Sequence, residues 1–241
     1  MPLSHKYHTI FFHIPKTAGS SIETLLDIRF NRATIHDNLL NHSNTGPDSP
    51  AFQHFLPAKI KQLLDADGRS NVWDSYRKFT VVRNPLERAV SSYVFLKRQN
   101  RFPQHTKTFP DFLRFAVKVI DENENCDEKY DSIPYLHHLR PQQHWFRPEN
   151  MVYDRVLRFE TLEQDVTKMC EFVKCPHRKL PRINMSSDRR GALETYYTDR
   201  EVVMLFDKAY GKDMNIGDFQ YEYPSSIHKL LTDTCIDGDT F

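Results

Sequence analysis

The chain has 241 residues, of which 39% are hydrophobic, 12% aromatic and 27% charged, and its formal net charge is +1 at pH 7. This length and composition favour one soluble globular domain and exclude a disordered chain. The near-zero charge excludes a global field that would attract nucleic acid or an anionic membrane, so any anion site must be local.

The first residues, MPLSHKYHTIFFHI, contain no signal-peptide segment, and no stretch approaches the roughly 20 apolar residues that span a bilayer. We therefore expect a cytoplasmic enzyme without a membrane or nucleic-acid partner, unless an N-terminal anchor has been lost. The four cysteines form no C-x-x-C pair, and the twelve histidines form no H-E-x-x-H motif. His137, His138 and His144 cluster in sequence, but without the spacing of metal ligands. The sequence thus indicates neither a disulfide framework nor a metal site.

Three short apolar, β-prone runs predict the strands of one buried sheet, because each is followed by a helical pattern. The strands and their helices are Tyr7–Ile14 with Ser20–Arg29, Phe79–Val82 with a helix from Pro85, and Met151–Phe159 with a helix from about Thr161. Repeated strand-then-helix order predicts an α/β fold, a single domain over 1–241 with a central, mainly parallel sheet flanked by helices. Ligands of such sheets bind at the carboxyl ends of the strands.

Two further helices are predicted at Pro57–Leu64 and Thr198–Tyr210, the second with Thr198 and Glu201 at the spacing of a capping box. The polar, turn-rich segment Asn31–Ala51 is expected to be a long surface loop that faces a substrate. The last residues, ending in DTCIDGDTF, are expected to be mobile.

The segment HIPKTAGSS connects the first predicted strand to the first predicted helix. Backbone N–H groups are free at such a junction, the helix dipole is positive there, and a small residue lets an anion come close. Lys16 adds a positive charge, and the hydroxyl residues add hydrogen-bond donors. The segment does not match G-x-x-x-x-G-K-[ST], because its lysine precedes its glycine. Spacing alone therefore leaves open an anion-binding loop or an ordinary turn.

The segment VVRNPLERAVSSY places Arg83 at the end of the second strand and Ser91 eight residues later, with Arg88 one turn before Ser91. An arginine fork and a serine hydroxyl that converge beside a helix start could hold a second phosphate group. A helix with ordinary surface arginines is the alternative.

Together, these two segments resemble the family of sulfotransferases that use 3′-phosphoadenosine 5′-phosphosulfate (PAPS). The likeness is to the branch of the carbohydrate O-sulfotransferases, such as those acting on heparan sulfate. Weaker similarities in FQHFLPAKI, VLRFETLEQD and YYTDREVVMLFDKAYGKDM extend it from about Thr9 to Tyr223. The resemblance implies a P-loop-like sulfotransferase fold.

The resemblance also implies a role for individual residues. Lys16 would contact the bridging oxygen of the donor and stabilise the charge on the departing phosphate. The DRRGA segment resembles the element that closes over the 3′-phosphate in cytosolic sulfotransferases, although its second basic residue is an arginine. The residues implied for the 5′-phosphate are Thr17, Ala18, Gly19, Ser20 and Ser21, and those implied for the 3′-phosphate are Arg83, Ser91, Arg189 and Arg190.

Sulfuryl transfer to a hydroxyl needs a base for the acceptor proton. His54, in FQHFLP, matches the place where this branch carries its catalytic histidine, and the alternative is a histidine that packs locally. Glu160 is the second candidate for the base, or else a residue that orients the loops. His13 is expected to brace the end of the first strand, while His36 and His144 lie in segments that could reach an acceptor.

The favoured prediction is a PAPS-dependent O-sulfotransferase that works by in-line displacement, with a histidine base and without metal, and releases 3′-phosphoadenosine 5′-phosphate (PAP). The acceptor would be a hydroxyl-bearing small molecule or a carbohydrate, and the near-neutral charge favours the small molecule. One rival is a small-molecule kinase with an atypical phosphate loop, which lacks the Walker glycine and an evident aspartate for Mg²⁺. The other is a non-catalytic nucleotide-binding relative.

Overall fold

A computed structural model of the chain describes residues 3–28, 54–103, 106–123, 129–130, 135–147, 151, 153–176, 179–181, 193–216 and 218–232. Several residues singled out in the sequence lie outside this described part. They are the segment Asn31–Ala51 with His36, the two arginines Arg189 and Arg190, and the end of the chain beyond residue 232.

A four-stranded sheet with the order β1-β2-β3-β4 forms the centre of the molecule. Its strands are β1 (Leu3–Ser4), β2 (Thr9–Phe12), β3 (Arg77–Val82) and β4 (Arg155–Arg158). The short strand β1 pairs antiparallel with β2, whereas β2, β3 and β4 run parallel, with Phe11 opposite Phe79 and Val81 opposite Leu157. The prediction of an α/β domain with a central, mainly parallel sheet is confirmed, and β2, β3 and β4 lie within or overlap the three predicted strands.

Helices cover both faces of this sheet. The longer ones are α1 (Gly19–Leu25), α3 (Pro57–Ala66), α4 (Ser70–Ser75), α5 (Pro85–Arg98), α6 (Phe109–Glu122), α8 (Leu162–Val173), α9 (Arg200–Tyr210) and α10 (Ser225–Thr232). Short 3-10 helices and a hairpin complete the described part, namely η2 (Leu136–His138), η3 (Gln142–Phe146), η4 (Leu193–Thr195), η5 (Gly211–Met214), β5 (Asn215–Ile216) and β6 (Phe219–Gln220).

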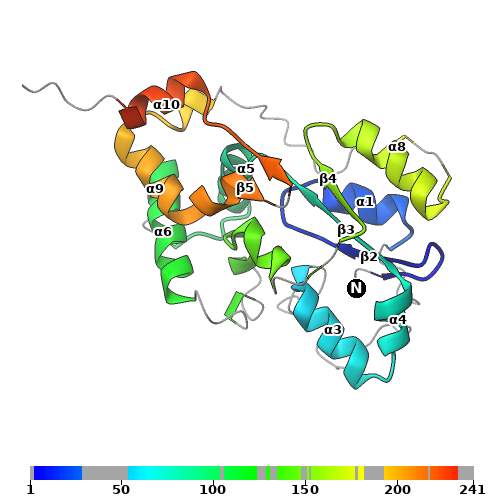
Figure 1. Ribbon diagram of the computed structural model, residues 1–241. Coiled ribbons are helices and arrows are strands. Elements are labelled where there is room, and N and C mark those ends of the chain that lie inside the picture. The colour runs from blue at the N-terminus through cyan, green and yellow to red at the C-terminus, as the bar shows by residue number, and fades with distance from the viewer. Residues whose placement is uncertain are drawn as a thin grey trace, which may run out of the picture.

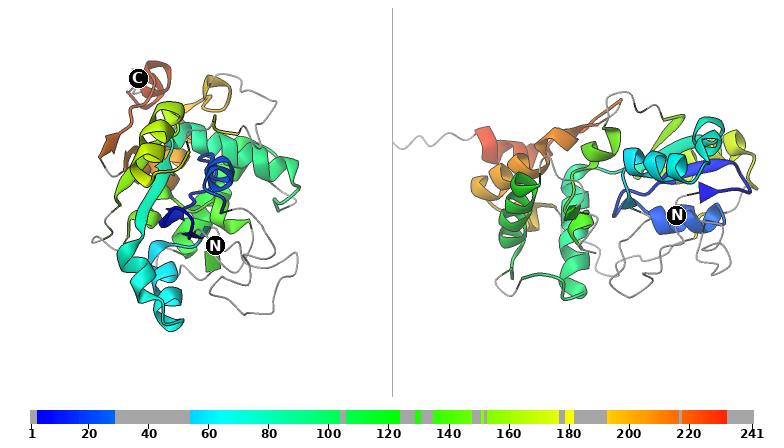
Figure 2. Two further views of the ribbon diagram at one scale, coloured as in Figure 1. Left: turned by 90° about the vertical axis from the view of Figure 1, so that its right-hand side faces the viewer. Right: turned by 90° about the horizontal axis from the view of Figure 1, so that it is seen from below.

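Alternation along the strands divides the apolar side chains between two cores, because successive residues of a strand point to opposite faces. Phe11 and Val81 pack with α1 and α8, which lie side by side in Figure 1. Phe12 and Val82 face the larger core, to which α3, α5, α6 and α9 contribute. Figure 2 shows α6, α9 and α10 gathered at the end of the molecule that is remote from α1 and α8.

Helices α4, α6 and α10 are missing from the prediction, although Thr108 and Asp111 form a reciprocal capping box at the start of α6. At α9 the predicted capping box of Thr198 and Glu201 is wrong. Asp199 is the N-cap residue and accepts from the Val202 N–H at 3.0 Å, while the Thr198 hydroxyl donates to Asp199. A carboxylate one residue closer to the helix thus takes the place of the threonine.

Within the described ranges, no helix is both long enough and apolar enough to cross a lipid bilayer.

Candidate functional site

The loop between β2 and α1 has an unusual backbone. Lys16 and Ala18 have φ angles of 70° and 69°, in the left-handed region that side chains other than glycine rarely adopt. Ala18 is the N-cap residue of α1, and no side chain caps that helix. The sign of φ changes along this loop, since Thr17 lies between two residues with positive φ. Such a change suits a concave cradle of N–H groups.

Side chains of the protein hold the carbonyl groups of this loop, beginning at its start. The His13 carbonyl accepts a hydrogen bond from His54 Nδ1 at 2.9 Å. The Ile14 carbonyl accepts from the Thr17 hydroxyl at 2.8 Å. The hydroxyl proton of Thr17 is therefore used within the loop, and this side chain stabilises the turn.

The next two carbonyls accept hydrogen bonds from arginine side chains. Arg88 belongs to α5, and Arg83 lies two positions before that helix begins. Arg88 Nε donates to the Pro15 carbonyl at 3.1 Å, and Arg83 Nη1 donates to the Lys16 carbonyl at 3.3 Å. Four consecutive carbonyls, from His13 to Lys16, thus have side-chain donors. Arg88 is fully buried and also donates to the Arg140 carbonyl at 2.8 Å, so it ties the loop to α5 and is not placed as a second phosphate ligand.

The N–H groups at the other end of the loop are different. No described residue accepts a hydrogen bond from the backbone N–H of Thr17, Ala18, Gly19 or Ser20. The negative ends of the loop dipoles are therefore covered by donors, whereas the positive ends are available. This asymmetry gives the loop the electrostatics of an anion-binding site.

Gly19 is required at the start of α1 because the His13 ring lies against it. A Cβ atom at Gly19 would overlap the Cγ, Cδ2 and Nε2 atoms of His13. His13 Nδ1 lies 2.7 Å from Glu23 Oε1, and both side chains are buried. As predicted, His13 braces the end of β2, and its contacts fix the carbonyl that meets His54.

His54 stands in a cluster of imidazole rings. Its ring centroid lies 4.4 Å from that of His13 and 4.4 Å from that of His137, and the ring of His138 lies 4.4 Å from that of His137. A carbonyl only accepts, so His54 Nδ1 carries the proton that it donates to the His13 carbonyl. The neutral ring then has its lone pair on Nε2, which is the atom that can accept a proton.

Burial keeps His54, His137 and His138 uncharged at neutral pH. The pKa of His54 is lowered well below its ordinary 6.5, first by burial and then by the other histidines. Burial and the nearby Arg140 lower the pKa of His137 to about 3. His138 has a pKa well below 6.5 for the same first reason, and Lys16 is among the cations that lower it further.

Lys16 brings a cation to the edge of the same cluster. Its Nζ lies 4.1 Å from the centroid of the Phe95 ring, and that ring lies 4.6 Å from the ring of His138. Burial, followed by repulsion from Arg83 and Arg98, lowers the pKa of Lys16 from 10.5 to about 8. The side chain still carries its proton at pH 7, beside histidines that do not.

Arg83 follows β3 directly and is buried. Its guanidinium carbon lies 4.1 Å from the centroid of the Phe159 ring, and Nη2 forms an ion pair with Glu87 at 2.8 Å. Ser91 is half-buried, one turn beyond Glu87 on α5. The convergence of Arg83 and Ser91 on a phosphate stays a prediction.

The start of α5 itself is closed by its own cap. Asn84 Oδ1 accepts from the N–H groups of Leu86 and Glu87 at 2.9 and 3.4 Å. The N–H groups of Leu86 and Glu87 therefore already have an acceptor within the helix cap.

Glu160 serves the same junction from β4. Its Oε1 accepts from the Asn84 N–H at 2.6 Å, and its Oε2 accepts from the Tyr221 hydroxyl at 3.3 Å. It thus orients the turn before α5. His144 packs edge-on against Tyr130, with ring centroids 5.9 Å apart, and is not one of the rings around His54.

Sequence reasoning did not connect His54 with His137 and His138, which are more than 80 positions away and whose rings the fold brings against it. The adjacent His137 and His138 were noticed in the sequence, but they lack the spacing of metal ligands and therefore predicted no site. Among the described residues, no group of three His, Cys, Asp or Glu side chains is arranged to hold a metal ion.

Comparison with known proteins gives this geometry a context. A sequence profile described as the sulfotransferase family matches residues 2–221. Carbohydrate sulfotransferase 14 of Mus musculus is 25% identical over 201 residues, which is 74% of this chain and 48% of that protein, and the Homo sapiens protein of the same name gives the same values. Carbohydrate sulfotransferase 11 of Rattus norvegicus is 27% identical over 184 residues, covering 66% of this chain and 48% of that protein.

The chain spans about half the length of the curated relatives that it matches. Their similarity overturns the prediction of a cytoplasmic enzyme, since these relatives are carbohydrate sulfotransferases. That prediction used the lack of a signal-peptide segment in MPLSHKYHTIFFHI and of any long apolar stretch in the chain, and a match to part of longer proteins weakens both arguments.

Proposed function

Because the chain belongs to the sulfotransferase family, we propose that it transfers the sulfuryl group of PAPS to a hydroxyl group of a carbohydrate, with His54 as the base. One observation carries the proposal. Four consecutive carbonyls of the loop after β2 are held by side-chain donors, and one of these donors is His54 itself. The candidate base is thus attached to the candidate phosphate loop.

The N–H groups of the loop would bind the 5′-phosphosulfate. They belong to residues with small side chains, which let an anion approach the backbone. Of the hydroxyl residues, Thr17 would contribute its N–H and its bracing hydrogen bond to Ile14, because its hydroxyl proton is used there. The residues proposed to surround the 5′-phosphate are Thr17, Ala18, Gly19, Ser20 and Ser21.

Arg83 and Ser91 would bind the 3′-phosphate, and Arg189 and Arg190 are proposed as further ligands. A phosphate at Arg83 would compete with the carboxylate of Glu87, which now holds Nη2 at 2.8 Å. Arginine has five N–H donors, so its guanidinium can bind both groups when they approach from different sides.

His54 would take the proton of the acceptor hydroxyl on Nε2. In the proposed step the acceptor oxygen forms a bond to sulfur, the bond from sulfur to the bridging oxygen breaks, and PAP leaves. Lys16 would stabilise the negative charge that develops on the bridging oxygen. The low pKa of His54 ensures the neutral form that can accept a proton, while the pKa of about 8 keeps Lys16 cationic at pH 7.

The names of the relatives favour a carbohydrate over the small-molecule acceptor that the charge balance suggests. A membership in this family also disfavours the kinase alternative. No described feature favours a non-catalytic role, since Lys16, His54 and Arg83 all reach the same loop.

Transfer of labelled sulfate from PAPS to a panel of glycans and hydroxylated small molecules tests the proposal. In His54→Ala the transfer rate should fall by about 10²–10⁴-fold, the usual contribution of a general base, while PAP affinity persists. His228→Ala, a change at an exposed histidine of α10, is the matched control and should keep the rate. Undiminished transfer by His54→Ala would exclude His54 as the base, and absence of PAP binding by the unaltered protein would refute the donor.

A further inference from the structure

Gln142, at the start of η3, pairs with the backbone of Arg83. Its side chain is fully buried. Its Oε1 accepts from the Arg83 N–H at 3.0 Å, and its Nε2 donates to the Arg83 carbonyl at 2.9 Å. The backbone hydrogen bonds that connect β3 with the neighbouring strand β4 end at Val82, one residue before Arg83. There the Phe159 N–H donates to the Val82 carbonyl at 2.8 Å. The amide of Gln142 therefore supplies the two hydrogen bonds that a longer neighbouring strand would have made.

Gln142 is in turn fixed by Asp213 of η5, a carboxylate with no exposed surface. Asp213 Oδ2 accepts from the Gln142 N–H at 2.8 Å. The same oxygen lies 4.0 Å from Arg88 Nη1, and Arg88 holds the Pro15 carbonyl through Nε. One buried carboxylate thus supports both the residue that pairs with Arg83 and the residue that holds the loop.

We propose that Gln142 is a positioning residue that fixes the guanidinium of Arg83 for the 3′-phosphate of the donor nucleotide, an inference that rests on the proposed function. Both backbone polar groups of Arg83 are bound by one rigid amide, so that amide sets the direction in which the Arg83 side chain leaves the backbone. The guanidinium then lies between the ring of Phe159 and the carboxylate of Glu87. A small backbone rotation at Arg83 would move the far end of this long side chain out of that position.

A role in stability alone makes a different prediction. If Gln142 only holds the fold together, its loss should lower the affinity for every nucleotide by the same factor. If it positions Arg83, its loss should lower the affinity for nucleotides with a 3′-phosphate more than the affinity for nucleotides without one. The ratio of the two affinities separates these cases, because a general loss of stability cancels in it.

The test is isothermal titration of PAP and of adenosine 5′-monophosphate (AMP), which lacks the 3′-phosphate. The protein should bind PAP more tightly than AMP. In Gln142→Met, which keeps the length of the side chain and removes both hydrogen bonds, PAP affinity should fall by about tenfold, whereas AMP affinity should change by less than about threefold. Arg83→Ala should lose the preference for PAP over AMP. Adding Gln142→Met to Arg83→Ala should change the PAP affinity little further.

Gln143→Met is the matched control. It makes the same change one residue along, and the Gln143 side chain bonds to the Lys212 carbonyl and not to Arg83. It should keep the ratio of PAP to AMP affinity. Gln142→Glu serves where Gln142→Met fails to fold, as judged by circular dichroism, because the carboxylate preserves the shape and the acceptor for the Arg83 N–H but cannot donate to its carbonyl.

The two hypotheses fail in different ways. If the unaltered protein binds PAP no more tightly than AMP, the proposed function is wrong. If it prefers PAP and the Gln142 variants keep that preference, the proposed function stands and the positioning role of Gln142 is refuted.

Discussion

Lys16→Met should make the protein inactive and more stable. Methionine has a similar length and no charge, so its chain can still pack against Phe95. Burial lowers the pKa of Lys16 from 10.5 to about 8, which means that folding disfavours its charged form. Removing the charge should therefore relieve a cost that the folded protein now bears.

The size of the effect follows from that pKa. Each pKa unit corresponds to about 1.4 kcal/mol, so the charge of Lys16 costs about 3 kcal/mol at pH 7. The cation–π interaction of Lys16 Nζ with the Phe95 ring offsets about 0.5–2 kcal/mol of this cost. The free energy of unfolding of Lys16→Met at pH 7 should then exceed that of the unaltered protein by about 1–3 kcal/mol.

The sign of the pH dependence gives a second measure. Below pH 8 both the folded and the unfolded chain carry a protonated Lys16, and the cost is complete. Between pH 8 and 10.5 the folded chain loses this proton first, so the cost decreases. From pH 7 to pH 9 the advantage of Lys16→Met should shrink by about 1 kcal/mol.

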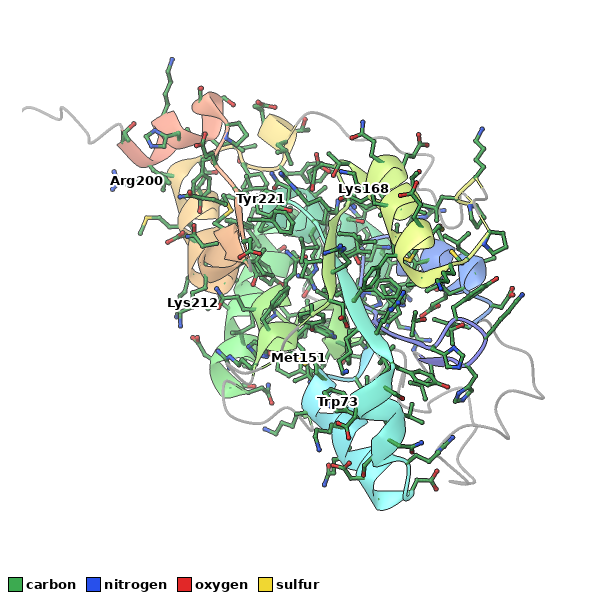
Figure 3. All side chains as sticks on the ribbon, turned by 45° about the vertical axis from the view of Figure 1, so that its right-hand side comes forward. Trp73, Met151, Lys168, Arg200, Lys212 and Tyr221 are labelled. Atoms are coloured by element: carbon green, nitrogen blue, oxygen red, sulfur yellow. The ribbon has the colours of Figure 1, made fainter. Side chains whose placement is uncertain are left out.

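Urea unfolding followed by tryptophan fluorescence measures both quantities, since Trp145 is fully buried in the folded protein. Lys168→Met is the matched control, because Lys168 is exposed on α8 (Figure 3) and should change neither stability nor sulfate transfer. A Lys16→Met protein less stable than the unaltered one by more than about 1 kcal/mol would refute the assignment of a buried, disfavoured charge. Transfer at a normal rate would refute its role in the reaction.

Three further predictions concern the loop, a helix cap and the pH profile. A Cβ at Gly19 overlaps the His13 ring, so Gly19→Ala should lower the free energy of unfolding in urea by about 1–3 kcal/mol. The same change should slow transfer, because the His13 carbonyl holds His54; an unaltered rate would contradict this link. Asp199→Ala should cost about 1 kcal/mol in thermal unfolding with kcat unchanged, and no loss would show that this cap contributes nothing. The rate of transfer should decline above about pH 8 as Lys16 loses its proton, whereas the acid limb should lie well below pH 6.5; Lys16→Arg, if active, should remove the alkaline decline.

The parts of the fold that the sequence predicted are those with local patterns. The three parallel strands are short apolar runs, and α5 begins at a proline, as the predicted helix does. The family could be identified from two segments, HIPKTAGSS and VVRNPLERAVSSY, because the residues that carry the resemblance lie close together within each segment. Helix α6 was overlooked even though its capping residues, Thr108 and Asp111, have a recognisable spacing.

The supports of the site could not be predicted, because they connect distant parts of the chain. Gln142 meets Arg83 across 59 positions, and Asp213 meets Gln142 across 71. A buried glutamine and a buried aspartate have no sequence signature that separates them from surface residues. Arg88 was placed by sequence only as one turn before Ser91, whereas its guanidinium donates to two backbone carbonyls inside the protein.

The protonation states of the site depend on one another. Burial lowers the pKa of both His54 and Lys16, yet the proposed reaction needs the first uncharged and the second charged. A positive charge on His138 would repel the ammonium group of Lys16, but burial keeps His138 neutral at pH 7. In the proposed reaction, the low pKa values of His137 and His138 would spare Lys16 further repulsion. No proton on His137 or His138 then adds to the positive charge that Lys16, Arg83 and Arg88 bring to the loop, and in the proposed reaction Nε2 of His54 would accept the proton of the acceptor.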